Sequence, residues 1–281
     1  MKVLFIGCGD IAQRTANLLP NNYRSFGLKR NTSGLPSRII PISADATSSQ
    51  HFYSVVSEGF DIWIATLTPS EFTEQAYRDS YLAAAKTIAT TVGSLDKPPK
   101  LVIWVSSTSV YGDCKSGWVD ETSKVNPTTF SGTILLEAEQ VINNLPCEHS
   151  IVRFSGIYGP GRSRMLGQVE AGKGRPEKPE QWSNRIHSRD CAGSLAHIIE
   201  IFSTGKSIAS LYLASDSQPV TQHDLRNWLA SQLSVNLAEE PVKMSSIRRC
   251  SNRLLLASGY RFIYPSYKEG YAQLINERQS T

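Results

Sequence analysis

The sequence predicts an α/β fold with a doubly wound parallel sheet and a smaller C-terminal lobe. Two observations support this class. Short apolar runs alternate with helical patterns over the first 155 residues, and a glycine-rich turn follows the first run directly. The runs are apolar throughout rather than alternating with polar residues, as in strands that helices cover on both faces. This alternation of strands and helices implies right-handed crossovers within one parallel sheet.

The elements of the first half follow in regular order. Strands are predicted over residues 2–6, 23–29, 38–42, 60–65, 100–105 and 150–154, and helices over 10–19, 48–58, 71–92, 128–144 and 188–203. Thr128 or Thr129 can cap the helix that follows Pro127. After residue 155 the pattern loosens into a segment rich in glycine, proline and charge. A strand at 211–215, a helix from Thr221 and two short helices complete the prediction.

The loosened segment indicates a second structural unit. A chain of 281 residues can hold one large α/β domain, or a core domain with a smaller lobe. Residues 1–155 with about 186–214 form the predicted first domain, and about 156–185 with 215–281 form the second lobe. Long loops in compact proteins tend to be functional or mobile.

The composition excludes several classes of protein. The formal charge of +4 is too small to indicate a nucleic-acid partner. The apolar N-terminal run is far shorter than the ~20 residues that span a membrane, and no signal-peptide pattern follows it. We therefore expect a cytoplasmic protein without a membrane partner. The five cysteines contain no CxxC pair, so no metal site is expected.

The turn after the first strand carries a nucleotide-binding pattern. In "VLFIGCGDIA", Gly7, Gly9 and Ala12 match the GxGxxA form of the dinucleotide fingerprint of a Rossmann-type sheet. Gly7 permits the tight turn, Gly9 lets a pyrophosphate approach, and Ala12 lets helix and strand pack closely. The helix start at Asp10 and Ile11 offers backbone N–H groups to the phosphates. The alternative is a tight turn without a ligand.

The second strand indicates which cofactor the turn would hold. An enzyme that uses NAD usually places an Asp or Glu near the end of this strand to bind the ribose 2′-hydroxyl. Here the strand ends in Lys29, Arg30 and Asn31, without a carboxylate. Arg30 can hold a 2′-phosphate through two hydrogen bonds, so NADP(H) is favoured over NAD(H). The alternative is that Arg30 is a solvated surface charge.

Two later strand ends complete the predicted cofactor site. Asp45, after the third strand, lies where an adenine amino group would be bound. Ala65, Thr66 and Leu67, at the end of the fourth strand, would pass beside the ribose and the phosphates.

A run of hydroxyl side chains follows the fifth strand, in "VSSTSVYG" (105–112). This run resembles the active-site edge of the extended short-chain dehydrogenase/reductase family, which includes NAD(P)-dependent epimerases and dehydratases. Other segments agree with the family pattern in order and spacing: "DET" (120–122), "VRFSGIYGPGR" (152–162), "NRIHSRDCAGSLAHII" (184–199) and "GYRFIYPSYKEGY" (259–271). The resemblance covers nearly the whole chain. It implies that the first domain binds NAD(P) and that the second lobe binds substrate.

The resemblance also implies roles for single residues. Ser107 matches the hydroxyl that holds the reacting oxygen, Thr108 matches its neighbouring donor, and Ser106 lies on the cofactor side. The family's catalytic tyrosine and lysine correspond to Ser131 and Leu135, so the chain resembles an atypical subgroup without the Tyr-Lys pair. Losing a general acid/base usually costs about 10²–10⁴-fold in rate.

Other side chains are candidates for the remaining roles. Tyr111 can act as a substitute acid, although the matching tyrosine mostly packs structurally in the family. His187 can contact substrate, or it can be a helix-start histidine beside Asp190. Arg162 belongs to a basic segment, which predicts an anionic small-molecule substrate. The alternative is a solvated basic loop. The other members of the segment are Arg164, Lys173, Arg175, Lys178, Arg185 and Arg189.

The sequence leaves two functions open. One is an NADP(H)-dependent oxidoreductase or epimerase-like enzyme, acting on a small anionic carbonyl or hydroxyl compound. The other is a catalytically silent NADP(H)-binding sensor or regulator. The resemblance implies a homodimer formed through the helices at 71–92 and 128–144.

Overall fold

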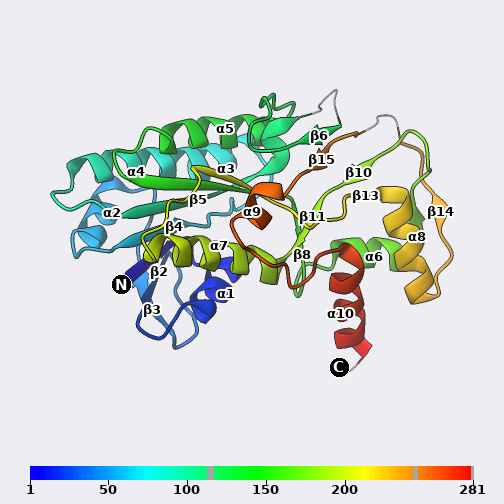
Figure 1. Ribbon diagram of the computed structural model, residues 1–281, viewed down its shortest axis with the longest axis horizontal. Helices are drawn as coiled ribbons and strands as arrows, with labels where there is room; N and C mark the ends of the chain where they lie inside the picture. Colours follow the sequence, from blue (N-terminus) through cyan, green and yellow to red (C-terminus); the bar gives the residue numbers. More distant parts are fainter. Residues whose placement is uncertain (113–116, 243–245, 280–281) are drawn as a thin grey trace. The chain divides into compact units, whose positions relative to one another are not determined.

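The central sheet has seven parallel strands in the order β12-β7-β5-β4-β1-β2-β3 (Figure 1), in a computed structural model that describes residues 1–112, 117–242 and 246–279. The first strand lies inside the sheet, where Ile6 is in register with both Leu28 and Ala65. The chain builds outward on one side of β1 and then on the other, which confirms the predicted doubly wound sheet. The strands are β1 (Lys2–Ile6), β2 (Arg24–Lys29), β3 (Ile39–Ser43), β4 (Ile62–Ala65), β5 (Leu101–Ser107), β7 (Glu148–Phe154) and β12 (Leu211–Ala214).

Helices cover both faces of this sheet. Figure 1 shows α2, α4 and α5 on one face and α1 and α7 on the other. The predicted helix at 71–92 is divided in three, because a π-helical turn, η1 (Arg78–Leu82), separates α3 from α4. The helices are α1 (Asp10–Leu18), α2 (Ser49–Val56), α3 (Glu74–Tyr77), α4 (Ala83–Ser94), α5 (Phe130–Ile142) and α7 (Ser188–Ser203).

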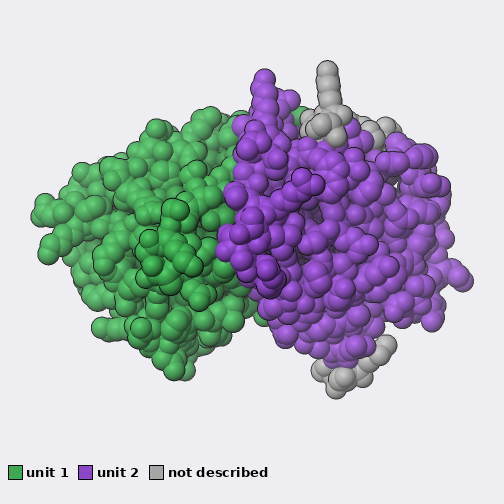
Figure 2. Space-filling view, viewed as in Figure 1, with its two compact units in different colours: residues 1–110, 127–153, 192–212 green, residues 111–126, 154–191, 213–281 purple. Residues whose placement is uncertain are grey.

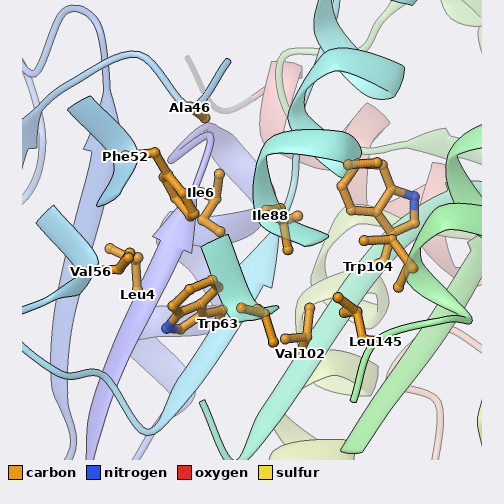
Figure 3. Packing of buried hydrophobic residues seen from close by; sticks show 14 of the residues in the cluster. Leu4, Ile6, Ala46, Phe52, Val56, Trp63, Ile88, Val102, Trp104 and Leu145 are labelled. Carbon is orange, nitrogen blue, oxygen red and sulfur yellow. The ribbon is translucent and has the colours of Figure 1, made fainter. Parts of the chain in front are cut away.

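The main core lies between the sheet and the helices α2, α4 and α5. Figure 3 shows Trp63 of β4 and Trp104 of β5 among aliphatic side chains of this core. Phe52 of α2 meets Trp63 edge to face, with ring centroids 5.3 Å apart. Burying a side chain of this size stabilises a fold by about 1.5–3 kcal/mol. The burial of these apolar strands therefore stabilises the sheet that carries the loops at the carboxyl ends of its strands.

The chain divides into two compact units (Figure 2). Unit 1 comprises residues 1–110, 127–153 and 192–212, and unit 2 comprises 111–126, 154–191 and 213–281. The predicted division assigned residues 111–126 and 186–191 to the first domain, whereas in the structure they belong to unit 2.

Unit 2 is built from short strand pairs and helices. Its core includes Tyr158, Leu166, Leu229 and Tyr271. The strand pairs are β10 (Trp182–Ser183) with β13 (Val220–Thr221), β11 (Arg185–His187) with β8 (Gly156–Tyr158), β14 (Ala238–Glu239) with β9 (Lys173–Gly174), and β15 (Arg249–Cys250) with β6 (Trp118–Val119). The helices are α6 (Arg164–Glu170), α8 (Gln222–Leu233), α9 (Arg253–Ala257) and α10 (Tyr267–Gln279).

Two further features of the fold concern its surface. The strand β3 forms one edge of the central sheet and carries Pro41 at its centre. In the three ranges that the structure describes, no helix combines the length and the apolarity needed to cross a membrane.

A buried ion pair joins α5 to β7 within unit 1. The Arg153 guanidinium donates to both carboxylate oxygens of Glu139, with Nη2 2.6 Å from Oε2 and Nε 3.0 Å from Oε1. Only 1% of the Glu139 side chain is exposed. Removing one partner from such a pair leaves an uncompensated buried charge.

We expect Glu139→Gln to lower the free energy of unfolding by about 3–5 kcal/mol, because it removes the carboxylate charge that pairs with the buried Arg153 guanidinium. Glu74→Gln is the matched control, since Glu74 pairs with Arg78 at the surface and exposed pairs contribute about 0–1 kcal/mol. Urea denaturation of both variants measures the difference. Equal stabilities for the two variants would contradict this account of the pair.

Candidate functional site

The turn between β1 and α1 is held by both neighbouring strands. Gly7 has a φ of +80°, a backbone conformation that glycine adopts without strain. Its N–H donates to the carbonyl of Leu28 on β2 at 2.9 Å, and its carbonyl accepts from Thr66 Oγ1 at 2.6 Å. A Cβ at this position would come within 3.1 Å of the Thr66 carbonyl. The turn is therefore as tight as the fingerprint predicts.

The N-terminus of α1 faces open space. Gly9 is its N-cap and makes no side-chain capping hydrogen bond. A Cβ built on Gly9 would have no heavy atom within 4 Å. Ile11 and Ala12 are buried and pack the helix, while Asp10 pairs with Arg14 at 2.6 Å. The N–H groups and partial positive charge of this helix end fit a phosphate group.

A cavity of about 650 Å³ opens beside this turn in unit 1. It brings together most of the predicted cofactor residues: Gly7, Gly9, Lys29, Arg30, Asn31, Asp45, Thr66 and Leu67. Ala65 and Ser106 are buried in their strands and are not among the lining residues, and neither are Asp10, Ile11 and Ala12. The predicted set therefore divides into residues that line the cavity and residues that support it.

Several residues that line another side of the cavity were not predicted. Glu71, Gln75 and Asp79 line it together with Ser70, Ala76 and Ser80. The Gln75 side-chain amide donates to Asp79 Oδ1 at 2.8 Å. A signal for this side of the cavity is present in the sequence, because residues 71, 75 and 79 repeat at the spacing of one polar helix face.

Charged side chains beside the cavity follow the ends of two strands, an acidic one after β3 and basic ones at the end of β2. After β3, the N–H and hydroxyl of Thr47 donate to Asp45 Oδ1 at 2.9 and 2.7 Å, and these bonds lower the pKa of Asp45. Asp45 is therefore an ionised acceptor at neutral pH. The end of β2 presents Lys29 and Arg30 to the cavity and no carboxylate.

The hydroxyl cluster lies at the carboxyl end of β5. The strand ends at Ser107, and a 3₁₀ turn covers Thr108–Tyr111. Ser107 Oγ accepts from the Ser109 N–H at 3.2 Å, and its side chain is half-buried. Thr108 is buried in unit 1, whereas Tyr111 is 1% exposed and belongs to unit 2.

The start of α5 packs closely on this turn. Thr129 caps the helix by accepting from the Gly132 N–H at 3.2 Å, and its hydroxyl lies 3.0 Å from that of Ser131. A Cβ on Gly132 would meet the Ser109 carbonyl at 2.7 Å. Ser131 and Leu135 are both buried in this helix.

A separate cavity of about 630 Å³ lies within unit 2. It is lined by arginines from the predicted basic segment, including Arg162 and Arg185, and by Arg226 and Gln222 of α8. Arg226 was not predicted, although it interrupts a buried helix face between Leu225 and Leu229. A charge within an otherwise apolar helix face is a signal that the sequence does carry.

His187 does not line this cavity. Its ring is 0% exposed and lies between Tyr158 and Tyr264, with centroids 5.2 and 4.1 Å away. The Nδ1 atom accepts from the Arg189 N–H at 3.2 Å. This placement does not support the predicted substrate contact of His187. The histidine packs in the interior of unit 2.

Asp216 is the buried carboxyl group near Arg185 in unit 2. Its backbone N–H donates to the Arg185 carbonyl at 2.7 Å, and its Oδ2 is buried without a hydrogen-bond partner. Burial raises the pKa of Asp216 to about 8, although the Arg185 charge opposes this rise. Burial therefore favours the protonated, neutral form of this carboxyl group.

Comparison with known proteins places the chain in a family. No protein-family model matches it. Over 100 residues it is 41% identical to the protein YeeZ of Escherichia coli K12, a match that covers 35% of each of the two chains. A solved structure from Methylobacillus flagellatus, of a protein assigned as an NAD-dependent epimerase/dehydratase, is 32% identical, with 99% of this chain and 98% of that one covered and a TM-score of 0.83. The chain belongs to the NAD-dependent epimerase/dehydratase family.

More distant members share the fold of this epimerase/dehydratase. The UDP-glucuronic acid 4-epimerase of Bacillus cereus, solved with UDP-glucuronic acid and NAD, is 18% identical with a TM-score of 0.79, and 96% of each chain is covered. The human epimerase family protein SDR39U1, solved with NADPH, is 17% identical with a TM-score of 0.75, and 95% of this chain and 96% of that one are covered. Family membership supports a general NAD(P)-binding, epimerase-like role.

Substitutions at Gly9 and Gly27 distinguish an effect on ligand binding from an effect on folding. We expect Gly9→Val to abolish nicotinamide cofactor binding and to leave the melting temperature unchanged, because its side chain enters open space. Gly27→Ala should instead lower stability by about 1–3 kcal/mol, since its Cβ would lie 2.7 Å from Ile39 and 2.8 Å from Cys8. Calorimetric titration with NADPH and NADH, together with thermal unfolding, tests both. Retained cofactor affinity in Gly9→Val would contradict the assignment of this cavity.

Proposed function

We propose that this protein is an NADP(H)-dependent oxidoreductase or epimerase-like enzyme that acts on a small anionic carbonyl or hydroxyl compound. The observation that carries the cofactor choice is the end of β2, where Lys29 and Arg30 line the unit 1 cavity without a carboxylate. A ribose 2′-phosphate carries charge that these cations neutralise, and a guanidinium can bind it through two hydrogen bonds. A ribose 2′-hydroxyl, by contrast, would find no carboxylate acceptor at this strand end.

The bound nicotinamide would supply or accept a hydride. Ser107 and Thr108 stand at the carboxyl end of β5, where parallel sheets of this type bind their ligands. Ser107 accepts the Ser109 N–H, which leaves its own hydroxyl proton as the donor to a substrate oxygen. Its role is to hold and polarise that oxygen.

The acid/base of this reaction is not the family's tyrosine and lysine pair. The resemblance assigns Ser131 and Leu135 to the corresponding helix positions, and both residues are buried in α5. A serine hydroxyl is a far weaker acid than a phenol, and leucine brings no charge to lower its pKa. An enzyme with this site must take its proton from another donor, or react more slowly by about 10²–10⁴-fold.

The same two residues favour a second function, a catalytically silent NADP(H)-binding sensor or regulator. Leu135 is 4% exposed and brings an uncharged, apolar side chain to its position. The cofactor cavity on the carboxyl side of the sheet does not depend on either residue. Cofactor binding and loss of turnover are therefore compatible in this chain.

Arg30→Ala tests the preference for NADP(H). We expect affinity for NADPH to fall by about 10–100-fold, the usual cost of a lost charge-assisted hydrogen bond, and affinity for NADH to change little. Arg24→Ala, at the opposite end of the same strand, is the control and should change neither. Fluorescence titration with both cofactors gives the comparison. Equal losses for NADPH and NADH would exclude the 2′-phosphate assignment.

Ser107→Ala distinguishes the enzyme from the sensor. Under the enzyme hypothesis, turnover of a carbonyl panel with NADPH should fall by at least the ~10²-fold typical of a lost oxyanion donor, with cofactor affinity unchanged. Hydride transfer followed by NADPH absorbance measures this loss. If the wild-type protein binds NADPH tightly and reduces no compound of the panel, the sensor function is favoured.

A further inference from the structure

The unit 2 cavity combines positive charge with an absence of acidic lining. Its described lining residues include Arg162, Arg164, Arg175, Arg185 and Arg226, and none of them is Asp or Glu. One of these arginines, Arg175, is neutralised outside the lining by Glu240. Arg185 and Arg226 have a different environment, and they define the chemistry of this cavity.

Arg226 is a buried cation with neutral partners only. Its side chain lies on α8, and the residue is 3% exposed. Nη1 donates to the Lys173 carbonyl and Nη2 to Gln168 Oε1, both at 2.7 Å. Its Nε–H is buried and has no hydrogen-bond partner. Burial lowers the pKa of Arg226, and the nearby charges of Arg175 and Arg185 lower it further, although the charge of Glu240 opposes this change.

Arg185 has the same incomplete pairing. Its Nη1 donates to the Tyr271 hydroxyl at 3.2 Å, and its guanidinium carbon lies 5.9 Å from the centre of that ring. Its Nε–H is also buried without a partner. Burial raises the pKa of the nearby Asp216 carboxyl group, which weakens its ability to neutralise Arg185.

A third unsatisfied atom of the lining is an acceptor. The side-chain oxygen of Gln222 is buried and accepts no hydrogen bond, although its backbone N–H donates to the Gln181 carbonyl at 2.7 Å. A buried polar group without a hydrogen-bond partner destabilises the fold, and a buried charge without a counter-charge does so more strongly. Arg185, Arg226 and Gln222 line one cavity, and the two guanidinium charges, with a side-chain amide beside them, indicate an anionic ligand with a hydrogen-bonding group.

We infer that the unit 2 cavity binds a doubly charged oxyanion that carries a hydroxyl group beside its anionic group. The negative charges pair with the guanidinium groups of Arg185 and Arg226. The ligand hydroxyl hydrogen-bonds to the side-chain amide of Gln222. This inference rests on the proposed function, for which it names the substrate class. A volume of about 630 Å³ is within the usual range for small-molecule sites, ~300–1,000 Å³.

Two kinds of molecule carry this chemistry, phosphorylated polyols and hydroxydicarboxylic acids. The probes are therefore glycerol 3-phosphate and malate, titrated calorimetrically into the full-length protein near pH 7.5. Succinate tests the hydroxyl, because it is malate without that group, and lactate tests the charge, because it is a monoanionic hydroxy acid. We expect at least one dianion to bind at least 10-fold more tightly than lactate, and malate to bind more tightly than succinate if it is the preferred arm.

Three variants test the residues. Arg185→Gln and Arg226→Gln each remove one cation and should weaken the preferred dianion by about 10–100-fold. Gln222→Glu keeps the shape of its side chain and adds a negative charge, so it should weaken the same probe without removing a buried guanidinium. Arg253→Gln is the control, because Arg253 is an exposed residue of unit 2 outside the cavity lining. Circular dichroism establishes that each variant is folded.

The inference is overturned if neither dianion binds more tightly than lactate. It is also overturned if folded Gln222→Glu and Arg185→Gln bind the probe as well as the Arg253→Gln control does. NADPH titration of the same samples gives an independent result for unit 1. Tight NADPH binding without dianion binding would reject this substrate class alone, whereas loss of both would also reject the proposed function.

Discussion

The nucleotide end of this protein depends on one backbone constraint, the left-handed conformation of Gly7 between β1 and α1. Its N–H and carbonyl are fixed by Leu28 of β2 and by Thr66, the residue that follows β4, so the ends of three strands determine the path of a single turn. That path points the N-terminus of α1 into open space. It also places the ends of β2 and β4 beside it, where they line one cavity. The lining of the unit 1 cavity depends on this geometry.

Much of the fold was accessible from the sequence, because a sheet covered on both faces needs strands that are apolar throughout. The run at 2–6 and the run at 60–65 satisfy that need, and both became central strands with Trp63 and Phe5 fully buried. The turn after residues 2–6 was predictable too, because its glycines permit a tight backbone turn. The π-helical turn in the predicted helix at 71–92 was not accessible, since no local pattern distinguishes it from a continuous helix.

The candidate sites were predictable only in part, because sequence patterns report neighbours along the chain and not neighbours in space. Residues 29–31, 45 and 66–67 were predictable, since the ends of adjacent parallel strands meet at one edge. Arg226 and Gln222 come from a helix about 40 residues beyond Arg185, and only folding brings them to the same cavity. His187 is the opposite case. Its residue type and its family motif suggested a substrate contact, whereas its ring is packed between aromatic rings.

The proline at the centre of β3 has a consequence for how copies of this chain can associate. An edge strand offers a row of backbone donors and acceptors that a strand from another molecule can extend. Pro41 removes one donor from that row, which is why proline in sheets is confined to edges. Growth of the sheet from one molecule into the next is thereby discouraged at this edge. The consequence is a sheet edge that resists fibre-like aggregation between copies of this chain.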